Sequence, residues 1–178
     1  MESNINQYSF IADAMLGKMA RKLRMFGFDT IYDSNIDDMD ILDSSKYQGR
    51  IVLTSDRTLF KRCKKKGIDT ILTYKGTELE NLVTIFSALN IKLINSQKLP
   101  HLCTCCNGLL GTIIDKNLIK NQIPDRLLHS KNIFYECTKC NKIYWTGTHL
   151  QRISCLIKEI NTKLKSRLIL NLRKSEES

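Results

Sequence analysis

A chain of 178 residues that is 42% hydrophobic has the length of one ordinary domain plus a small second module. It contains no run near the ~18 apolar residues of a membrane-spanning helix, and MESNINQYSF lacks the basic and apolar regions of a secretory signal, so we expect a cytoplasmic protein with no membrane partner. The net charge of +10 predicts a polyanionic partner such as nucleic acid. The positive charge is concentrated in residues 101–178, which hold 13 basic and 6 acidic side chains, whereas residues 1–100 hold 15 basic and 12 acidic side chains.

The first ninety-odd residues alternate short apolar runs, typical of buried strands, with segments of helical periodicity. Strands are expected at 8–12, 29–33, 50–54, 69–74 and, as a final edge strand, 91–95. Helices are expected at 14–26, 39–48, 57–66 and 78–90, with Gly27 and Gly67 as C-terminal stops. This alternation predicts an α/β fold over residues 8–98, with a parallel sheet flanked by helices.

Three aspartates stand where strands end or helices begin. Asp13 follows the first expected strand, Asp56 follows the third, and Asp38 opens the helix before the third strand. Because parallel strands place their carboxyl ends along one edge, Asp13 and Asp56 could converge there, with Asp38 or Asp40 from the neighbouring helix. Carboxylate oxygens suit Mg²⁺ or Mn²⁺, and such an ion could position a water and stabilise charge on a scissile phosphate.

Helix capping is the alternative role of these aspartates, because Asp is a preferred N-cap residue.

The first helix carries four basic side chains largely off its apolar stripe: Lys18, Arg21, Lys22 and Arg24. They form either a solvated face or a grip on phosphates near Asp13. The candidate substrate-binding residues of this part are Lys18, Arg21 and Arg57.

From about residue 99 the pattern changes, and two C-x-x-C pairs appear at Cys103–Cys106 and Cys137–Cys140. A two-residue spacing lets a tight knuckle point both sulfurs at one ion, and two knuckles complete a four-cysteine site for structural zinc. The long separation of the pairs implies an inserted excursion at about 111–133. Free thiols or a redox pair are the alternative, and Cys105 could compete with Cys106 as a ligand.

The second knuckle is followed by candidate nucleic-acid contacts at Tyr144, Trp145 and His149. The two aromatic rings could stack on bases, and His149 could contact a phosphate. Alternatively, the rings pack against the ribbon and His149 caps the last helix. The expected zinc ribbon covers residues 99–148.

Residues 149–174 predict a long amphipathic helix. Its apolar side chains recur at helical spacing: Leu150, Ile153, Ile157, Ile160, Leu164 and Leu168. Its other face is basic: Arg152, Lys158, Lys163, Lys165 and Arg167. We expect this helix to add to the electrostatic attraction for nucleic acid, or to pair with a protein partner, such as a second copy of the chain.

Five motifs, taken in chain order over about residues 10–152, resemble the Mut-seven carboxy-terminal RNase family: FIADAMLGKMARKLRMFGFDT, DDMDIL, GRIVLTSDRTL, CTCCNGLL and YECTKCNKIYWTGTH. The resemblance implies a PIN-like nuclease domain at 8–98 with an appended zinc ribbon, and metal-dependent RNA cleavage by an acidic cluster. It implies Asp13, Asp38 and Asp56 as the acids, with Asp40 the nearest candidate for a fourth, and the four paired cysteines as zinc ligands.

The expected function is therefore that of an endoribonuclease that hydrolyses RNA phosphodiester bonds with Mg²⁺ or Mn²⁺ at its aspartates. The alternative is a non-catalytic RNA-binding or ribosome-associated module that kept the fold and the ribbon. The two differ in one requirement, because only the enzyme needs a divalent ion at the carboxylates.

Overall fold

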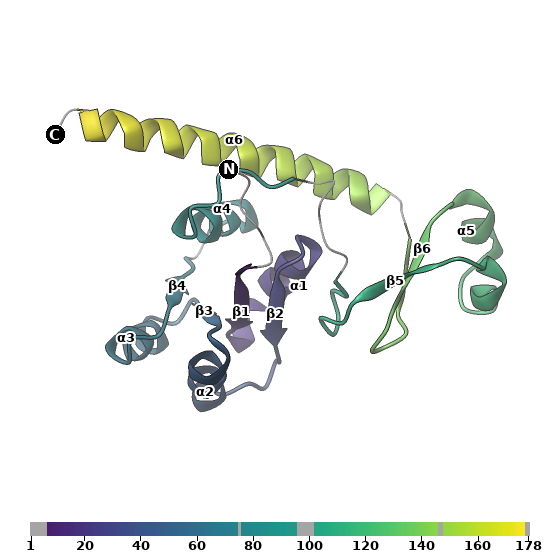
Figure 1. Cartoon of the computed structure of the whole chain (residues 1–178), viewed down its shortest axis with the longest axis horizontal. Helices are drawn as coiled ribbons and strands as arrows, with labels where there is room; N and C mark the ends of the chain where they lie inside the picture. The colour runs from purple at the N-terminus through teal and green to yellow at the C-terminus, as the bar shows by residue number, and fades with distance from the viewer. Residues whose placement is uncertain (1–6, 75, 96–101, 146–147, 177–178) are drawn as a thin grey trace.

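The computed structural model describes residues 7–74, 76–95, 102–145 and 148–176, and within the last helix it describes the side chains of residues 152–168. Figure 1 shows an α/β body, a small three-stranded sheet beside it, and the long helix α6 (Thr148–Glu176) passing over the body. Each helix in the described ranges is too short or too polar to cross a bilayer.

Four parallel strands form the central sheet, in the order β2-β1-β3-β4. The strands are β1 (Ser9–Ala12), β2 (Asp29–Tyr32), β3 (Ile51–Thr54) and β4 (Thr70–Leu72). Ala12 lies beside both Tyr32 of β2 and Leu53 of β3, so the carboxyl ends of these three strands meet at one edge. The predicted α/β fold with a parallel sheet is confirmed.

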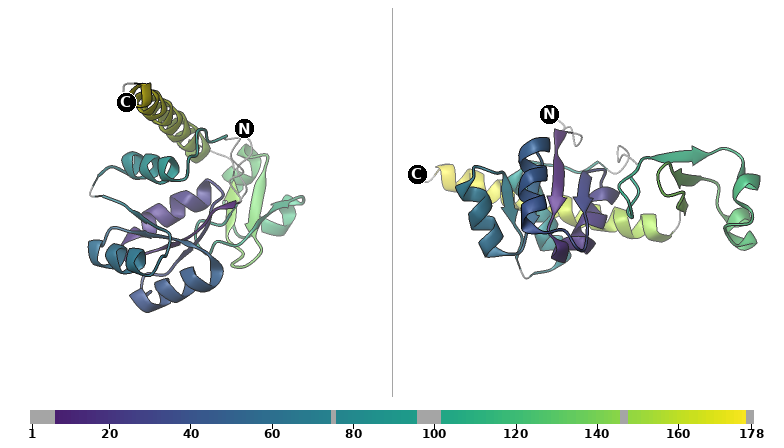
Figure 2. Two further views of the ribbon diagram at one scale, coloured as in Figure 1. Left: turned by 60° about the vertical axis from the view of Figure 1, so that its left-hand side comes forward. Right: turned by 90° about the horizontal axis from the view of Figure 1, so that it is seen from below.

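Two layers of helices cover the two faces of this sheet (Figure 2). One layer holds α1 (Gly17–Met25) and α4 (Glu78–Ala88), and the other holds α2 (Asp38–Gln48) and α3 (Arg57–Lys65). Alternate strand residues supply the two cores: Phe10 and Leu53 pack with α1 and α4, whereas Ile11 and Val52 pack with α2 and α3. The period of two along each strand explains why both faces are apolar.

The apolar stripe of α6 packs against α4 and completes the first core. Ile157, Ile160 and Leu164 are buried in the cluster that also contains Leu82 and Phe86 of α4. Burying such a side chain contributes about 1.5–3 kcal/mol. The stripe from Ile153 to Leu164 therefore packs on the chain's own core, whereas Leu168 is exposed. Pairing with a partner chain stays a prediction.

The expected edge strand at 91–95 is wrong, because these residues form no strand in the structure. The side-chain amide of Asn161 on α6 forms hydrogen bonds with both backbone polar groups of Ile94. Ile94 N–H donates to Asn161 Oδ1 (2.9 Å), and Asn161 Nδ2 donates to the Ile94 carbonyl (3.0 Å). Ile91 and Ile94 are buried under the helix. The apolar pattern thus reflects packing on α6, which local periodicity does not distinguish from a strand.

The second body, which we call the ribbon, comprises residues 102–145. Its antiparallel sheet contains β5 (Leu110–Ile113), β6 (Phe134–Cys137) and β7 (Ile143–Trp145). The excursion between the cysteine pairs covers 114–133, so it begins after β5 rather than at 111, and it contains a 3-10 helix (Lys116–Ile119) and α5 (Asp125–Ser130). Only a small cluster around Ile119, Ile123 and Phe134 forms its apolar core.

Candidate functional site

Thr54 connects two of the candidate catalytic aspartates at the carboxyl edge of the sheet. Its hydroxyl donates to Asp13 Oδ2 (2.7 Å) and accepts from the backbone N–H of Asp56 (2.9 Å). Thr54 is fully buried, and its carbonyl accepts the backbone N–H of Thr73 at 2.8 Å and the Thr73 hydroxyl at 3.2 Å. Asp13 and Asp56 are therefore positioned by one residue that sequence reasoning missed, although it stands inside the LTSDR motif.

Asp13 and Asp56 also cap helices. Asp13 Oδ1 accepts from Met15 N–H (3.4 Å) at the start of the 3-10 helix Ala14–Leu16, and Asp56 Oδ1 accepts from Thr58 N–H (2.6 Å) at the start of α3. The capping role offered as an alternative is thus present. Since an ionised carboxylate has about four acceptor positions, capping leaves capacity for a cation, and the two roles are compatible.

Asp38 and Asp40 lie in the first turn of α2, where Asp37 rather than Asp38 is the N-cap and accepts from Asp40 N–H (2.8 Å). The expectation that Asp38 caps this helix is wrong. Its carboxylate forms an ion pair with Arg62 of α3. No set of three carboxylates in the described ranges lies close enough to share one ion, so a catalytic role for Asp38 or Asp40 stays a prediction.

The basic side chains of this region divide into exposed and occupied groups. Lys18 and Arg21 on α1 and Arg57 at the start of α3 are exposed. Lys22 pairs with Glu78 (3.1 Å). Arg24 is only 3% exposed, so the expectation that it belongs to a solvated or phosphate-binding face is wrong; its side chain turns toward the ribbon.

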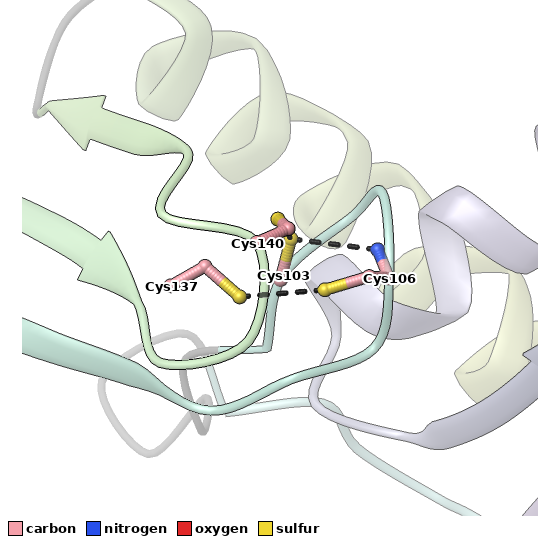
Figure 3. Close-up of side chains that lie close together, drawn as sticks. All are labelled: Cys103, Cys106, Cys137 and Cys140. Atoms are coloured by element: carbon pink, nitrogen blue, oxygen red, sulfur yellow. Dashed lines mark hydrogen bonds between the residues drawn. The ribbon is translucent and has the colours of Figure 1, made fainter.

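The four paired cysteines form a compact cluster (Figure 3). All four sulfur atoms lie within 4.8 Å of one another. The Cys103 and Cys140 sulfurs are 3.6 Å apart, and those of Cys106 and Cys137 are 3.4 Å apart. A tetrahedral zinc ion with bonds of about 2.3 Å needs sulfurs about 3.8 Å apart. The cluster therefore has the donor atoms and the spacing that zinc requires.

The two knuckles repeat the same backbone geometry. Cys103 N–H donates to the Gly108 carbonyl (2.8 Å) and Cys137 N–H to that of Lys142 (3.0 Å), which closes each turn. The residue after each pair, Asn107 or Asn141, has a positive φ of 65° or 56°, a conformation that Asn tolerates better than most residues. A Cβ added at Gly108 would lie 2.9 Å from the Cys137 sulfur, so only glycine fits there.

Crowding makes four thiolates unfavourable without a cation. Burial opposes ionisation of Cys103, but hydrogen bonds from Tyr144 and from the backbone N–H groups of Cys106 and Cys105 lower the pKa of its thiol to about 6. The Lys142 backbone N–H lowers the pKa of Cys140, yet the neighbouring cysteines and burial raise it to about 12. A divalent cation among the sulfurs removes this conflict, which supports the fit to zinc.

The candidate nucleic-acid contacts after the second knuckle differ in how exposed their side chains are. The Tyr144 hydroxyl lies 3.0 Å from the Cys103 sulfur and 3.3 Å from Thr104 Oγ1, so its polar end is engaged inside the ribbon. Trp145 is 40% exposed. His149 is in α6, but its side chain lies outside the described residues. Base stacking by Tyr144 and Trp145 stays a prediction.

A polar interface joins the first knuckle to the edge strand β2, and sequence reasoning missed it. Arg24 donates from Nε to the Thr30 carbonyl (2.9 Å) and from Nη1 to the carbonyls of Thr104 (3.0 Å) and Cys105 (2.8 Å). Asn107 accepts from Thr30 N–H (3.1 Å) and donates to Asp29 Oδ1 (2.6 Å). Both polar backbone groups of Thr30 on the open edge are thereby satisfied.

Asp29, the first residue of β2, is the charged centre of this interface. Burial opposes its ionisation, but hydrogen bonds from Arg50 and Asn107 outweigh burial and hold the pKa of Asp29 below its usual value. Because the pKa is depressed on folding, the carboxylate stabilises the interface at pH values above about 4 and loses that contribution as the pH falls through the lowered pKa.

Asn107→Ala is expected to destabilise the zinc-loaded protein by about 2–4 kcal/mol more than Asn141→Ala. Both changes put alanine at a positive φ and cost about the same strain. Only Asn107→Ala removes a hydrogen bond to a carboxylate and leaves Thr30 N–H without its acceptor. Denaturant unfolding with matched zinc content measures the difference, and equal destabilisation by the two variants would show that the interface contributes nothing.

Comparison with known protein families gives one match over most of the chain. A family model described as "Mut7-C RNAse domain" matches residues 8–157. This span covers the parallel sheet, the ribbon with its four cysteines and the start of α6. No curated protein and no solved structure gave a significant match.

Proposed function

Because this chain belongs to the Mut7-C RNAse domain family, we propose that it is an endoribonuclease that hydrolyses RNA with Mg²⁺ or Mn²⁺ at the carboxyl edge of its sheet. A ribonuclease-type function follows from the family. The metal, the residues that hold it and the RNA contacts are the proposal. The observation that carries it is the Asp13–Thr54–Asp56 arrangement at adjacent strand ends of the parallel sheet.

The carboxylates at this edge fit a magnesium-type ion in number and chemistry. Mg²⁺ in phosphoryl-transfer sites is typically bound through one or two carboxylates, with waters and substrate phosphate completing the shell. Asp13 and Asp56 would provide two, and Asp38 is the proposed third once it leaves Arg62. The bound ion would supply an activated water and stabilisation of charge on the phosphate. Buried Thr54 would keep the Asp13 carboxylate oriented as RNA enters.

Exposed cations beside this edge suit the RNA backbone. Lys18 and Arg21 project from the helix that follows Asp13, and Arg57 directly follows Asp56. Arg and Lys contacts to phosphates position a nucleic acid without reading its sequence. We therefore propose that these three residues orient the scissile strand, whereas zinc at the four cysteines has a structural role because they occupy every coordination position.

Cleavage of end-labelled RNA by protein freed of Mg²⁺ and Mn²⁺ but still carrying its zinc, with Mg²⁺ or Mn²⁺ then added back, tests the proposed function. We expect no cleavage before addition and cleavage after it, with zinc content unchanged throughout. The zinc assay is needed because a chelator strong enough to strip the ribbon would also stop the enzyme. RNA binding without cleavage at any tested concentration of either ion would instead favour the non-catalytic RNA-binding or ribosome-associated module.

A further inference from the structure

A groove of about 510 Å³ lies between the edge strand β2 and the ribbon. Its lining includes Asp29, Tyr32, Arg50, Leu102, Leu109 and Lys139. The volume is within the range of sites that bind small molecules or single nucleotides. In Figure 1 the segment that leads into β5 lies beside β2, at the edge of the parallel sheet. We call this groove the ribbon groove.

The ribbon groove is continuous with the proposed catalytic edge. Tyr32 ends β2 at the carboxyl edge and pairs in register with Ala12, the residue before Asp13. The Tyr32 hydroxyl also donates to the carbonyl of Ala14, on the other side of Asp13 (3.2 Å). One end of the groove is thus about one strand spacing from Asp13, and the other end lies against the first knuckle.

Basic side chains line the groove. Arg24, Arg50 and Lys139 are among its lining residues. Asp29 is its acidic member, and its carboxylate is already paired with Arg50 at 2.9 Å. Arg24 is bonded to carbonyls of the first knuckle, whereas exposed Lys139 remains available for a phosphate.

The apolar lining favours unpaired bases over a duplex. Leu109 is 67% exposed, and it lines the groove together with Leu102 and Tyr32. Single-stranded nucleic acids bind where cations track the backbone and flat or apolar side chains meet the bases. A duplex hides its base faces and presents mainly phosphates and sugars.

We propose that the ribbon groove holds a single-stranded segment of the RNA that extends from the scissile phosphate toward the zinc ribbon. The proposal rests on the proposed function for its position relative to the cut, and it names the substrate class as RNA with unpaired nucleotides beside the cleavage site. Lys139 contacts a phosphate of this segment, and Leu109 contacts a base.

Binding by a double variant tests the groove, with a matched control from the same module. Lys139→Glu with Leu109→Asn changes the groove. Lys120→Glu with Leu118→Asn makes the same changes at an exposed lysine and an exposed leucine of the 114–133 excursion. Both are made in an Asp13→Asn background, so that RNA stays intact. Fluorescence anisotropy is measured with labelled oligouridine and with an RNA duplex of equal length, at matched zinc content.

We expect the groove variant to bind oligouridine about tenfold more weakly and the control variant to stay within about twofold, while duplex binding changes little in either. In the catalytically intact chain the groove variant should raise KM about tenfold with little change in kcat. Equal weakening by both variants, or equal loss for duplex and single strand, overturns the proposal. Binding is read without cleavage, so an inactive wild type rejects the proposed function and still leaves the groove testable.

Discussion

Asp13→Asn is expected to reduce RNA cleavage at saturating Mg²⁺ or Mn²⁺ by about a thousandfold or more, with little loss of stability. The amide has one oxygen, which can still accept from the Thr54 hydroxyl, and the hydrogen bond that is lost is the long one from Met15 N–H (3.4 Å). The cost to stability is therefore about 1 kcal/mol. The substitution removes the negative charge that would hold the ion, and metal stabilisation of a phosphoryl transition state is worth several kcal/mol. Single-turnover cleavage of end-labelled RNA measures the effect.

Asp43→Asn is the matched control, since Asp43 is an exposed aspartate of α2. It lines a different pocket, together with Gly49 and Gly67, which follow the ends of α2 and α3. The control variant should retain full activity. Asp56→Asn should resemble Asp13→Asn, whereas Asp38→Asn should cost less because Arg62 already neutralises that carboxylate. If Asp13→Asn and Asp43→Asn cleave RNA equally well, the carboxyl edge is not the catalytic site and its aspartates are helix caps.

Loss of zinc is expected to unfold the ribbon. Structural zinc in small four-ligand modules contributes about 10–16 kcal/mol of apparent binding free energy, whereas the ribbon's own apolar cluster is small. Cys137→Ser removes a buried ligand, and we expect it to release zinc and to make residues 114–133 sensitive to protease. Limited proteolysis with mass spectrometry, together with a zinc assay, measures both effects.

The α/β body should lose part of its stability in the same variant. Without the folded knuckle, Arg24 loses two carbonyl acceptors and Asp29 loses the Asn107 amide, so a buried guanidinium remains partly unsatisfied at the edge of β2. Cys155→Ser, at an exposed cysteine of α6, controls for the chemical change and should be neutral. A Cys137→Ser protein that keeps a full complement of zinc and resists protease at 114–133 would contradict the zinc assignment.

Several features of this protein follow from residues close together in the sequence. The apolar runs and helical periodicity predicted the four parallel strands and the helices that flank them, because those patterns report which side of each segment faces a core. The two C-x-x-C pairs predicted the four-sulfur cluster, since knuckle geometry is local to each pair. The motif order also predicted the family that matches residues 8–157.

Other features were decided only by tertiary structure. Arg24 appeared to lie on a solvated face, yet it is buried because the ribbon, eighty residues later in the sequence, supplies carbonyls for its guanidinium. The apolar pattern predicted a strand at 91–95, yet the backbone N–H and carbonyl of Ile94 form hydrogen bonds with the side chain of Asn161 on α6. Thr54 acquires its role because β1 and β3 are neighbours. In each case the free energy of a polar group depends on a partner remote in sequence, and no local pattern identifies that partner.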